Sequence, residues 1–479
     1  MTALVLVVGV ASMAFGEVID VRGGFGWDGD RLGRLSADFP NFVHAGAIDF
    51  YQAARVGPSA VVHAALILSE LEPSRPNVVA LWQGMNLILL LASSALWTSL
   101  AGTWRLSSRG HWVGFAILFG GFHILKMSFF CPVLTDTAGF TLGLALLVCA
   151  VQKRAAGIVV IAVVSAFVWP TNFYAALALL VANQAPPSAV PVEGWRSRVG
   201  LVAATALTGG LGAVLLHADD ALQGVVLSDG APVWRQSLWM SIPLAAAFVG
   251  VATLPLIRSL TAASLDDIRA WAFSRRTALA IATAVVLIVA ARTAHAHIGT
   301  QPAKLDSAVM VLRIIYESVT RPLAFLVAHV AYFGPSVMLA VLVWPRAADV
   351  VRRCGPGVVV VTIGALVLSL GSESRGLMNF WPFFAAFTAC AIDELDVPSH
   401  LLRAWALWSV VASRIWLPIN GAGSLLKAPL AMPAQHYFMS FGPWMADNAF
   451  LAFAAVASAS GAFALALLST SRRPPAADR

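Results

Sequence analysis

The chain has 479 residues, of which 59% are hydrophobic and only 11% are charged, whereas soluble domains carry roughly 25% charged residues. Apolar stretches about long enough to cross a bilayer recur along the whole length, which excludes a soluble enzyme with a single anchor. The formal net charge is +7, but the basic residues lie between apolar runs rather than on one face, which argues against a nucleic-acid partner.

The apolar runs predict an all-α, polytopic transmembrane bundle of about 12–14 membrane helices. The start resembles a signal peptide, but it lacks a basic region and a small-residue cleavage site, so we expect a retained first helix. Short runs around 126–128 and 169–172 predict re-entrant or partial helices on the outer face, where they line a cavity. The expected helices span 2–16, 78–100, 112–126, 136–151, 155–169, 172–183, 199–216, 238–257, 277–293, 322–344, 357–370, 377–391, 403–417 and 448–469.

Basic residues of the short loops predict the orientation, because arginine and lysine stay on the cytoplasmic side. An even number of crossings then places both termini in the cytoplasm. These loop and tail residues are Arg105, Arg109, Lys153, Arg154, Arg196, Arg198, Arg275, Arg276, Arg346, Arg352, Arg353, Arg472 and Arg473. The outer segments, which together with the adjoining Asp136 hold 16 of the 24 acidic residues, are 17–77, 127–135, 217–237, 294–321, 371–376 and 418–447.

We expect two parts in this architecture. An N-terminal transmembrane module, residues 1–185, carries a first outer loop, 17–77, with the catalytic groups. The helices of 186–479 complete the cavity. Chemistry is therefore expected on the outer face.

Two carboxylates, Asp28 and Asp30, stand among glycines directly after the first helix. Glycines allow the backbone to approach a ligand closely, and apolar surroundings at a membrane interface can raise the pKa of a carboxylate toward that of a general base. The pair could also share a divalent cation through its oxygens. An ordinary solvated turn is the alternative.

Arg55 follows in the same loop and enters the next apolar segment. A guanidinium near lipid needs an anionic partner. This partner is either a phosphate or a structural carboxylate such as Asp49 or Glu70.

Two further outer turns carry charges. Lys126 precedes a turn with Pro132 and Asp136, where Asp136 or Thr135 could cap the next helix, or where Asp136 could serve an acceptor or phosphate site. Arg375 lies in the glycine-bounded turn 371–376. It could simply reach the interface, but on the same face as Asp28 and Lys126 it becomes a phosphate-binding candidate.

The order of these motifs resembles that of the polytopic glycosyltransferases of the GT-C fold, closely over residues 1–185 and loosely beyond. The motifs are the Trp27-Asp28-Gly29-Asp30 loop, Tyr51 to Pro58 with its arginine, Pro132 to Asp136, and Glu373-x-Arg375 followed by Pro382. Leu32 stands where relatives often have an aromatic residue, and we expect no soluble C-terminal domain of the oligosaccharyltransferase kind, since only about nine residues follow the last predicted helix.

The resemblance implies a hexosyltransferase of the mannosyltransferase-like kind, which moves a sugar from a polyprenyl-phosphate donor to a hydroxyl of a glycan, lipid or protein acceptor. Asp28 would be the general base, with Asp30 open as an alternative, and Asp136 a second carboxylate. The cations Arg55, Lys126 and Arg375 would hold the donor phosphate. No dedicated metal ligands are assigned, and metal dependence stays open. The expected location is the bacterial inner membrane, with the site facing the periplasm or exterior. A transporter or a flippase of lipid-linked saccharides is the other class considered.

Overall fold

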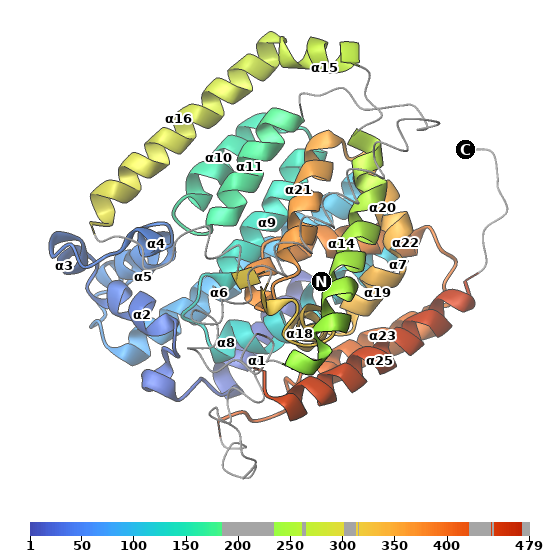
Figure 1. Ribbon diagram of the computed structural model, residues 1–479. Coiled ribbons are helices and arrows are strands. Elements are labelled where there is room, and N and C mark those ends of the chain that lie inside the picture. Colours follow the sequence, from blue (N-terminus) through green and yellow to red (C-terminus); the bar gives the residue numbers. More distant parts are fainter. Residues whose placement is uncertain are drawn as a thin grey trace.

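The computed structural model describes residues 1–183, 234–260, 265–300, 313–314, 316–420, 442 and 445–471. The regular elements of this part are helices, which confirms the predicted all-α class (Figure 1). The helix predicted at 199–216 and the basic pairs Arg196/Arg198 and Arg472/Arg473 lie outside the described residues.

Most predicted helices begin and end within a few residues of their expected bounds. The predicted helix 322–344 is broken at Gly334 and Pro335, where the glycine has a φ of 88°. The first-half helices are α1 (Thr2–Phe15), α6 (Arg75–Thr103), α7 (Ser108–Phe119), α8 (Ser128–Phe130), α9 (Asp136–Val151), α10 (Ala155–Ser165) and α11 (Pro170–Ala182). The second-half helices are α14 (Leu238–Leu260), α15 (Leu265–Ala272), α16 (Arg275–Ile298), α18 (Ala324–Phe333), α19 (Ser336–Leu342), α20 (Trp344–Arg353), α21 (Pro356–Leu368), α22 (Trp381–Asp393), α23 (Ser399–Ala412) and α25 (Asp447–Ser469).

The chain is a multi-pass membrane protein. Four helices of the described part are long and apolar enough to cross a bilayer: α6, α14 from Trp239, α16 and α25. A fifth span is formed if Ser108–Phe119 and His123–Phe130, which meet at a bend of 56°, are taken together. Eight shorter apolar helices of 10–17 residues accompany them. The bend falls where the sequence predicts a re-entrant or partial helix, and it includes the π-helical turn His123–Met127.

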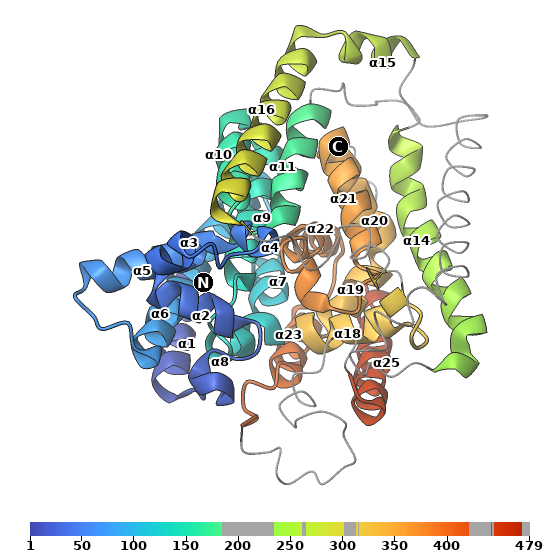
Figure 2. The ribbon, with the colours of Figure 1, turned by 60° about the vertical axis from the view of Figure 1, so that its left-hand side comes forward.

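The first outer loop is folded into short helices, whereas the sequence predicts only a long connection. They are α2 (Gly29–Ala37), α3 (Phe39–His44), α4 (Phe50–Ala53) and α5 (Val56–Leu68). These helices lie together at one end of the bundle (Figures 1 and 2). Trp82 of α6 is fully buried beneath them and donates its indole N–H to the hydroxyl of Ser36 at 3.0 Å. Burial of this large ring fixes the loop on the membrane helices.

The two halves of the chain share one core. Helix α22 packs against α7 and α9, and α21 packs against α11. Figure 2 shows the second-half helices beside those of the first half. The division at residue 185 remains a prediction, but the described parts of the two halves are packed together.

At the end of the bundle opposite the short helices, two predicted cytoplasmic loops meet. Arg109 contacts Asp396 at 3.3 Å, and Arg353 contacts Glu394 at 2.6 Å. Basic residues from separate loops therefore lie at the same end, and the side of the membrane that this end faces stays a prediction.

We expect reporter fusions after Arg109, Arg154, Arg276 and Arg353 to read as cytoplasmic. The physical reason is the retention of basic loops on the cytoplasmic side during insertion. Alkaline phosphatase and fluorescent-protein fusions at these four positions measure it. Two or more periplasmic readings would reverse the orientation and place the candidate site in the cytoplasm.

Candidate active site

Arg375 joins two carboxylates that are far away in the sequence. Its Nε donates to Oδ1 of Asp136 at 2.9 Å and its Nη2 to Oδ2 of Asp136 at 3.3 Å. Its Nη1 donates to Oδ2 of Asp28 at 2.7 Å. The side chain of Asp136 is 8% exposed, that of Arg375 17% and that of Asp28 67%. The group therefore runs from the protein interior to an open carboxylate.

The chain just after the turn that carries Arg375 packs directly against the backbone of α9. A Cβ at Gly143 of α9 would collide with the carbonyl oxygen of Asn379. Asn379 donates to the side-chain oxygen of Asn172 at 3.0 Å, and Asn172 donates to the carbonyl of Gly139 at 2.9 Å. Asn172 and Asn379 are fully buried, and each donates a side-chain hydrogen bond, so they fix the turn relative to α9.

Glycine also brings Asp28 to the site. A Cβ at Gly29 would collide with the carbonyl oxygen of Val133, so the start of α2 lies directly on the turn before Asp136. That turn is held from α6 by Asn86, whose amide donates to the carbonyls of Ser128 and Pro132 at 2.9 and 3.0 Å. The carboxylates of Asp28 and Asp136 can therefore meet the same guanidinium.

The side chains before and at the start of α9 do not cap this helix, which was the structural alternative for Thr135 and Asp136. Asp28 precedes α2 and Thr135 precedes α9, but neither makes a side-chain capping hydrogen bond. Asp136 occupies the first turn of α9 and bonds Arg375 instead.

Asp30 points to different partners. Its Oδ2 lies 3.0 Å from Arg34 and 3.5 Å from Arg22. Because Asp28 is bonded to Arg375 and Asp30 to these two arginines, the two carboxylates do not fit a shared divalent cation. Among the described residues, no group of three or more His, Cys, Asp or Glu side chains has a metal-binding arrangement.

Arg55 lies between α4 and α5, with its guanidinium 4.5 Å from the ring centre of Tyr51 and 5.0 Å from that of Trp169. The structural partner considered in the sequence, Asp49, instead faces Arg31 at 3.5 Å. Within the described part of the chain Arg55 forms no ion pair, and its Nε is buried without a hydrogen-bond partner. This cation, which acts electrostatically on Asp28, is therefore available to an anion.

Lys126 does not contact this group in the described structure. Its ammonium donates to Oε1 of Glu17 at 2.9 Å and to the carbonyl of Leu417 at 3.0 Å. Burial opposes ionisation of Glu17, but the bonds from Lys126 and from the backbone N–H groups of Ile419 and Asn420 outweigh it and lower the pKa of this carboxyl. The ammonium has a structural partner, and phosphate binding by Lys126 stays a prediction.

The charge of Arg375 dominates the acid–base state of Asp28. It lowers the pKa of the Asp28 carboxyl, although partial desolvation by the surrounding protein acts to raise it, and Arg55 and Arg313 act in the same direction as Arg375. The expectation of a raised pKa is therefore wrong for this state. Burial alone would lower the pKa of Arg375, but the charges of Asp136 and Asp28 raise it well above its usual value. The site thus holds a permanent cation and an ionised, paired carboxylate.

The sequence interpretation assigned no role to a second carboxylate cluster beside this group. Glu317 is 2% exposed and bonds Arg313 at 2.9 Å. Its other oxygen lies 3.4 Å from the hydroxyl of Ser372 and from the backbone N–H of Glu373, in the turn that carries Arg375. A charged pair four residues apart just before an apolar helix was the available signal in the sequence.

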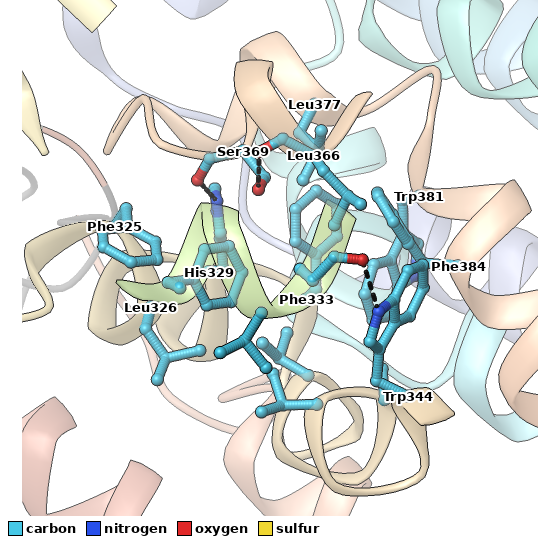
Figure 3. A pocket seen from close by; sticks show the side chains of 16 residues that line it. Phe325, Leu326, His329, Phe333, Trp344, Leu366, Ser369, Leu377, Trp381 and Phe384 are labelled. Carbon is cyan, nitrogen blue, oxygen red and sulfur yellow. Dashed lines mark hydrogen bonds between the residues drawn. The ribbon is translucent and has the colours of Figure 1, made fainter. Parts of the chain in front are cut away.

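An apolar pocket adjoins the other side of this turn. Its volume is about 140 Å³, and Leu377, Leu366, Phe325 and the aromatic rings of Phe333, Trp381 and Phe384 contribute to its lining (Figure 3). His329 projects into it, with its ring nitrogens bonded to the carbonyl of Ser369 at 2.7 Å and the hydroxyl of Ser374 at 2.9 Å. Ser374 directly precedes Arg375, so the pocket and the charged group share one turn.

The structure therefore brings Asp28, Asp136 and Arg375 into direct contact, with Arg55 nearby. Asp30 and Lys126 lie in separate ion pairs. No protein-family model matches the chain, and no curated protein matches it. Among solved structures, the fold is similar to that of the archaeal oligosaccharyltransferase AglB from Archaeoglobus fulgidus, solved in complex with an inhibitory peptide and a dolichol-phosphate. The TM-score is 0.41 and the identity 11%, over 99% of this chain and 56% of AglB. The chain thus spans little more than half the length of AglB.

Proposed function

We propose that the protein is a membrane glycosyltransferase of the GT-C type, which moves a sugar from a polyprenyl-phosphate donor to an acceptor hydroxyl. The observation that carries this proposal is the bridge of Arg375 between Asp28 and Asp136, beside Arg55, which has no ion-pair partner among the described residues. An exposed carboxylate next to two cations supplies both a base and a phosphate site. The motif order that resembles GT-C enzymes supports the same reaction.

Two arginines suit a departing lipid phosphate. Arginine presents a planar set of donors that matches phosphate oxygens, and fixed cations stabilise the charge that develops on a leaving group. Asp136 holds Arg375 by two hydrogen bonds, so the guanidinium needs little reorganisation when the phosphate arrives. The Nη1 bond to Asp28 is the one that a phosphate would replace.

This exchange would activate the base. When phosphate charge neutralises Arg375 and Arg55, the two strongest cationic influences that lower the pKa of Asp28 are weakened. Asp28 then becomes a better proton acceptor. The acceptor hydroxyl gives its proton to Asp28, its oxygen bonds to the sugar C1, and the C1–O bond to phosphate breaks with its electron pair leaving on the polyprenyl phosphate.

The apolar pocket supports a lipid-linked donor. It lies on the same turn as Arg375, so an apolar chain attached to a phosphate could occupy it while the phosphate contacts the guanidinium. We place the site on the periplasmic or outer face of the bacterial inner membrane, with a glycan, lipid or protein acceptor.

The experiment uses the full-length protein in lipid nanodiscs with a panel of radiolabelled polyprenyl-phosphate sugars and a membrane extract as acceptor. The expected result is release of polyprenyl phosphate together with a labelled acceptor. Movement of an intact lipid-linked sugar across proteoliposomes, without release of phosphate, would instead establish the flippase alternative.

Arg55→Lys is expected to weaken donor binding by about tenfold while leaving thermal stability close to wild type. The lysine keeps the charge but loses the planar donor set that a phosphate engages, and no described carboxylate depends on Arg55. Binding of a labelled polyprenyl phosphate and a thermal melt measure the two effects. Arg31→Lys is the matched control, since Arg31 pairs with Asp49 at 3.5 Å. Equal loss of folded protein and of binding in Arg55→Lys would make Arg55 structural.

A further inference from the structure

Glu317 lies between the segment before α18 and the turn that carries Arg375. One oxygen accepts from Nε of Arg313 at 2.9 Å. The other faces the Ser372 hydroxyl and the Glu373 N–H, each at 3.4 Å. Its side chain is 2% exposed, so water does not replace these partners. The carboxylate is the described link between Arg313 and the backbone of residues 372–373.

We propose that Glu317 is a positioning residue for Arg375: ionised and anchored on Arg313, it holds the 371–375 turn so that the guanidinium can bridge Asp28 and Asp136. The inference rests on the proposed function for its effect on transfer. Its effect on the turn itself is independent of that function.

The environment of Glu317 makes its contacts with the 371–375 turn depend on pH. Burial and the facing charge of Glu373 raise the pKa of Glu317 to about 7, against the opposing effect of Arg313. A protonated carboxyl accepts more weakly from the backbone N–H and from Arg313. Below this pKa the turn therefore loses its anchor. Folding disfavours the ionised form of Glu317, so the titration of this carboxyl lowers the free energy of unfolding as pH rises through 7. The fold is therefore more stable on the acid side, where the anchor is lost. Loss of the anchor can thus be separated from loss of the fold.

The test compares wild type, Glu317→Gln, Glu317→Asp and Glu373→Gln. In wild type, kcat/KM should fall about tenfold for each pH unit below 7, because the ionised fraction falls in that proportion. Glu317→Gln should have a low kcat/KM at every pH, without the fall below pH 7. Glu317→Asp should recover part of the activity. In Glu373→Gln the fall in kcat/KM should begin at a lower pH, because a negative neighbour of Glu317 is removed.

Amide hydrogen exchange of residues 371–376 in the full-length protein gives a readout that needs no substrate. We expect exchange corrected for its intrinsic pH dependence to rise below pH 7 in wild type, and to be high and insensitive to pH in Glu317→Gln. If transfer is absent for every donor but this exchange pattern holds, the proposed function fails and the positioning role stands. If amide exchange in wild type does not change with pH, or if kcat/KM of Glu317→Gln still falls below pH 7, the positioning role is overturned.

Discussion

Asp28→Asn is expected to lower sugar transfer by about 10²–10⁴-fold, the usual cost of removing a general base. The amide keeps the shape of the carboxylate and can still accept from Arg375, but it cannot take the acceptor proton. Asp28 is 67% exposed, so folding should tolerate the change. Initial rates with a labelled donor, alongside protein yield and donor binding, measure the effect.

Asp30→Asn is the matched control, since Asp30 lies two residues away and faces Arg22 and Arg34. Its transfer rate should stay within a few-fold of wild type. If Asp30→Asn collapses while Asp28→Asn is active, the base lies two residues further along. If both variants transfer normally, neither carboxylate of this loop is the base.

Arg375→Gln is expected to abolish measurable transfer and also to destabilise the protein. Removing a fixed donor from a developing charge costs about 10²–10³ in rate. It also leaves the buried Asp136 without its partner, and breaking a buried pair in this way commonly costs about 3–5 kcal/mol. Arg375→Lys should retain more stability because its charge remains. Thermal melts in detergent and transfer rates separate the two effects.

The double variant Asp136→Asn/Arg375→Gln separates the structural role of Arg375 from its catalytic role. Removing both charges should recover much of the stability lost in Arg375→Gln, because no uncompensated buried charge is left and Asp28 is exposed to solvent. Transfer should stay absent. Recovery of transfer in the double variant would contradict phosphate binding by Arg375 and leave it a purely structural residue.

Hydrophobic length and spacing were sufficient to predict most helices, because lipid requires each segment to satisfy its own backbone. Helix α9 begins and ends at its predicted residues, 136 and 151. The helices α2–α5 were missed, since each of them is shorter than a membrane span, including the apolar 13-residue helix α5. These helices are held in place by tertiary contacts, such as the buried Trp82 ring that bonds Ser36.

Motif order and sidedness predicted that Asp28, Lys126, Asp136 and Arg375 lie on one face. The structure brings Asp28, Asp136 and Arg375 into contact, whereas Lys126 bonds Glu17. The partners of the other charges were not predictable in the same way. Lys126 meets Glu17 across 109 positions and Asp49 faces Arg31, because charge pairing is decided by packing rather than by spacing. The lowered pKa of Asp28 was missed for the same reason.

The separation of Arg375 from Asp136 by 239 positions also bears on how the protein is made. During synthesis α9 reaches the membrane long before residue 375 is translated, so the nascent chain carries a carboxylate whose cation does not yet exist. Until then Asp136 must stay in contact with water or another polar group, because an isolated charge in an apolar interior is too costly. Arg375, in the last quarter of the chain, neutralises a carboxylate that the first third has already inserted. The ion pair of the candidate site therefore forms at a late step of assembly.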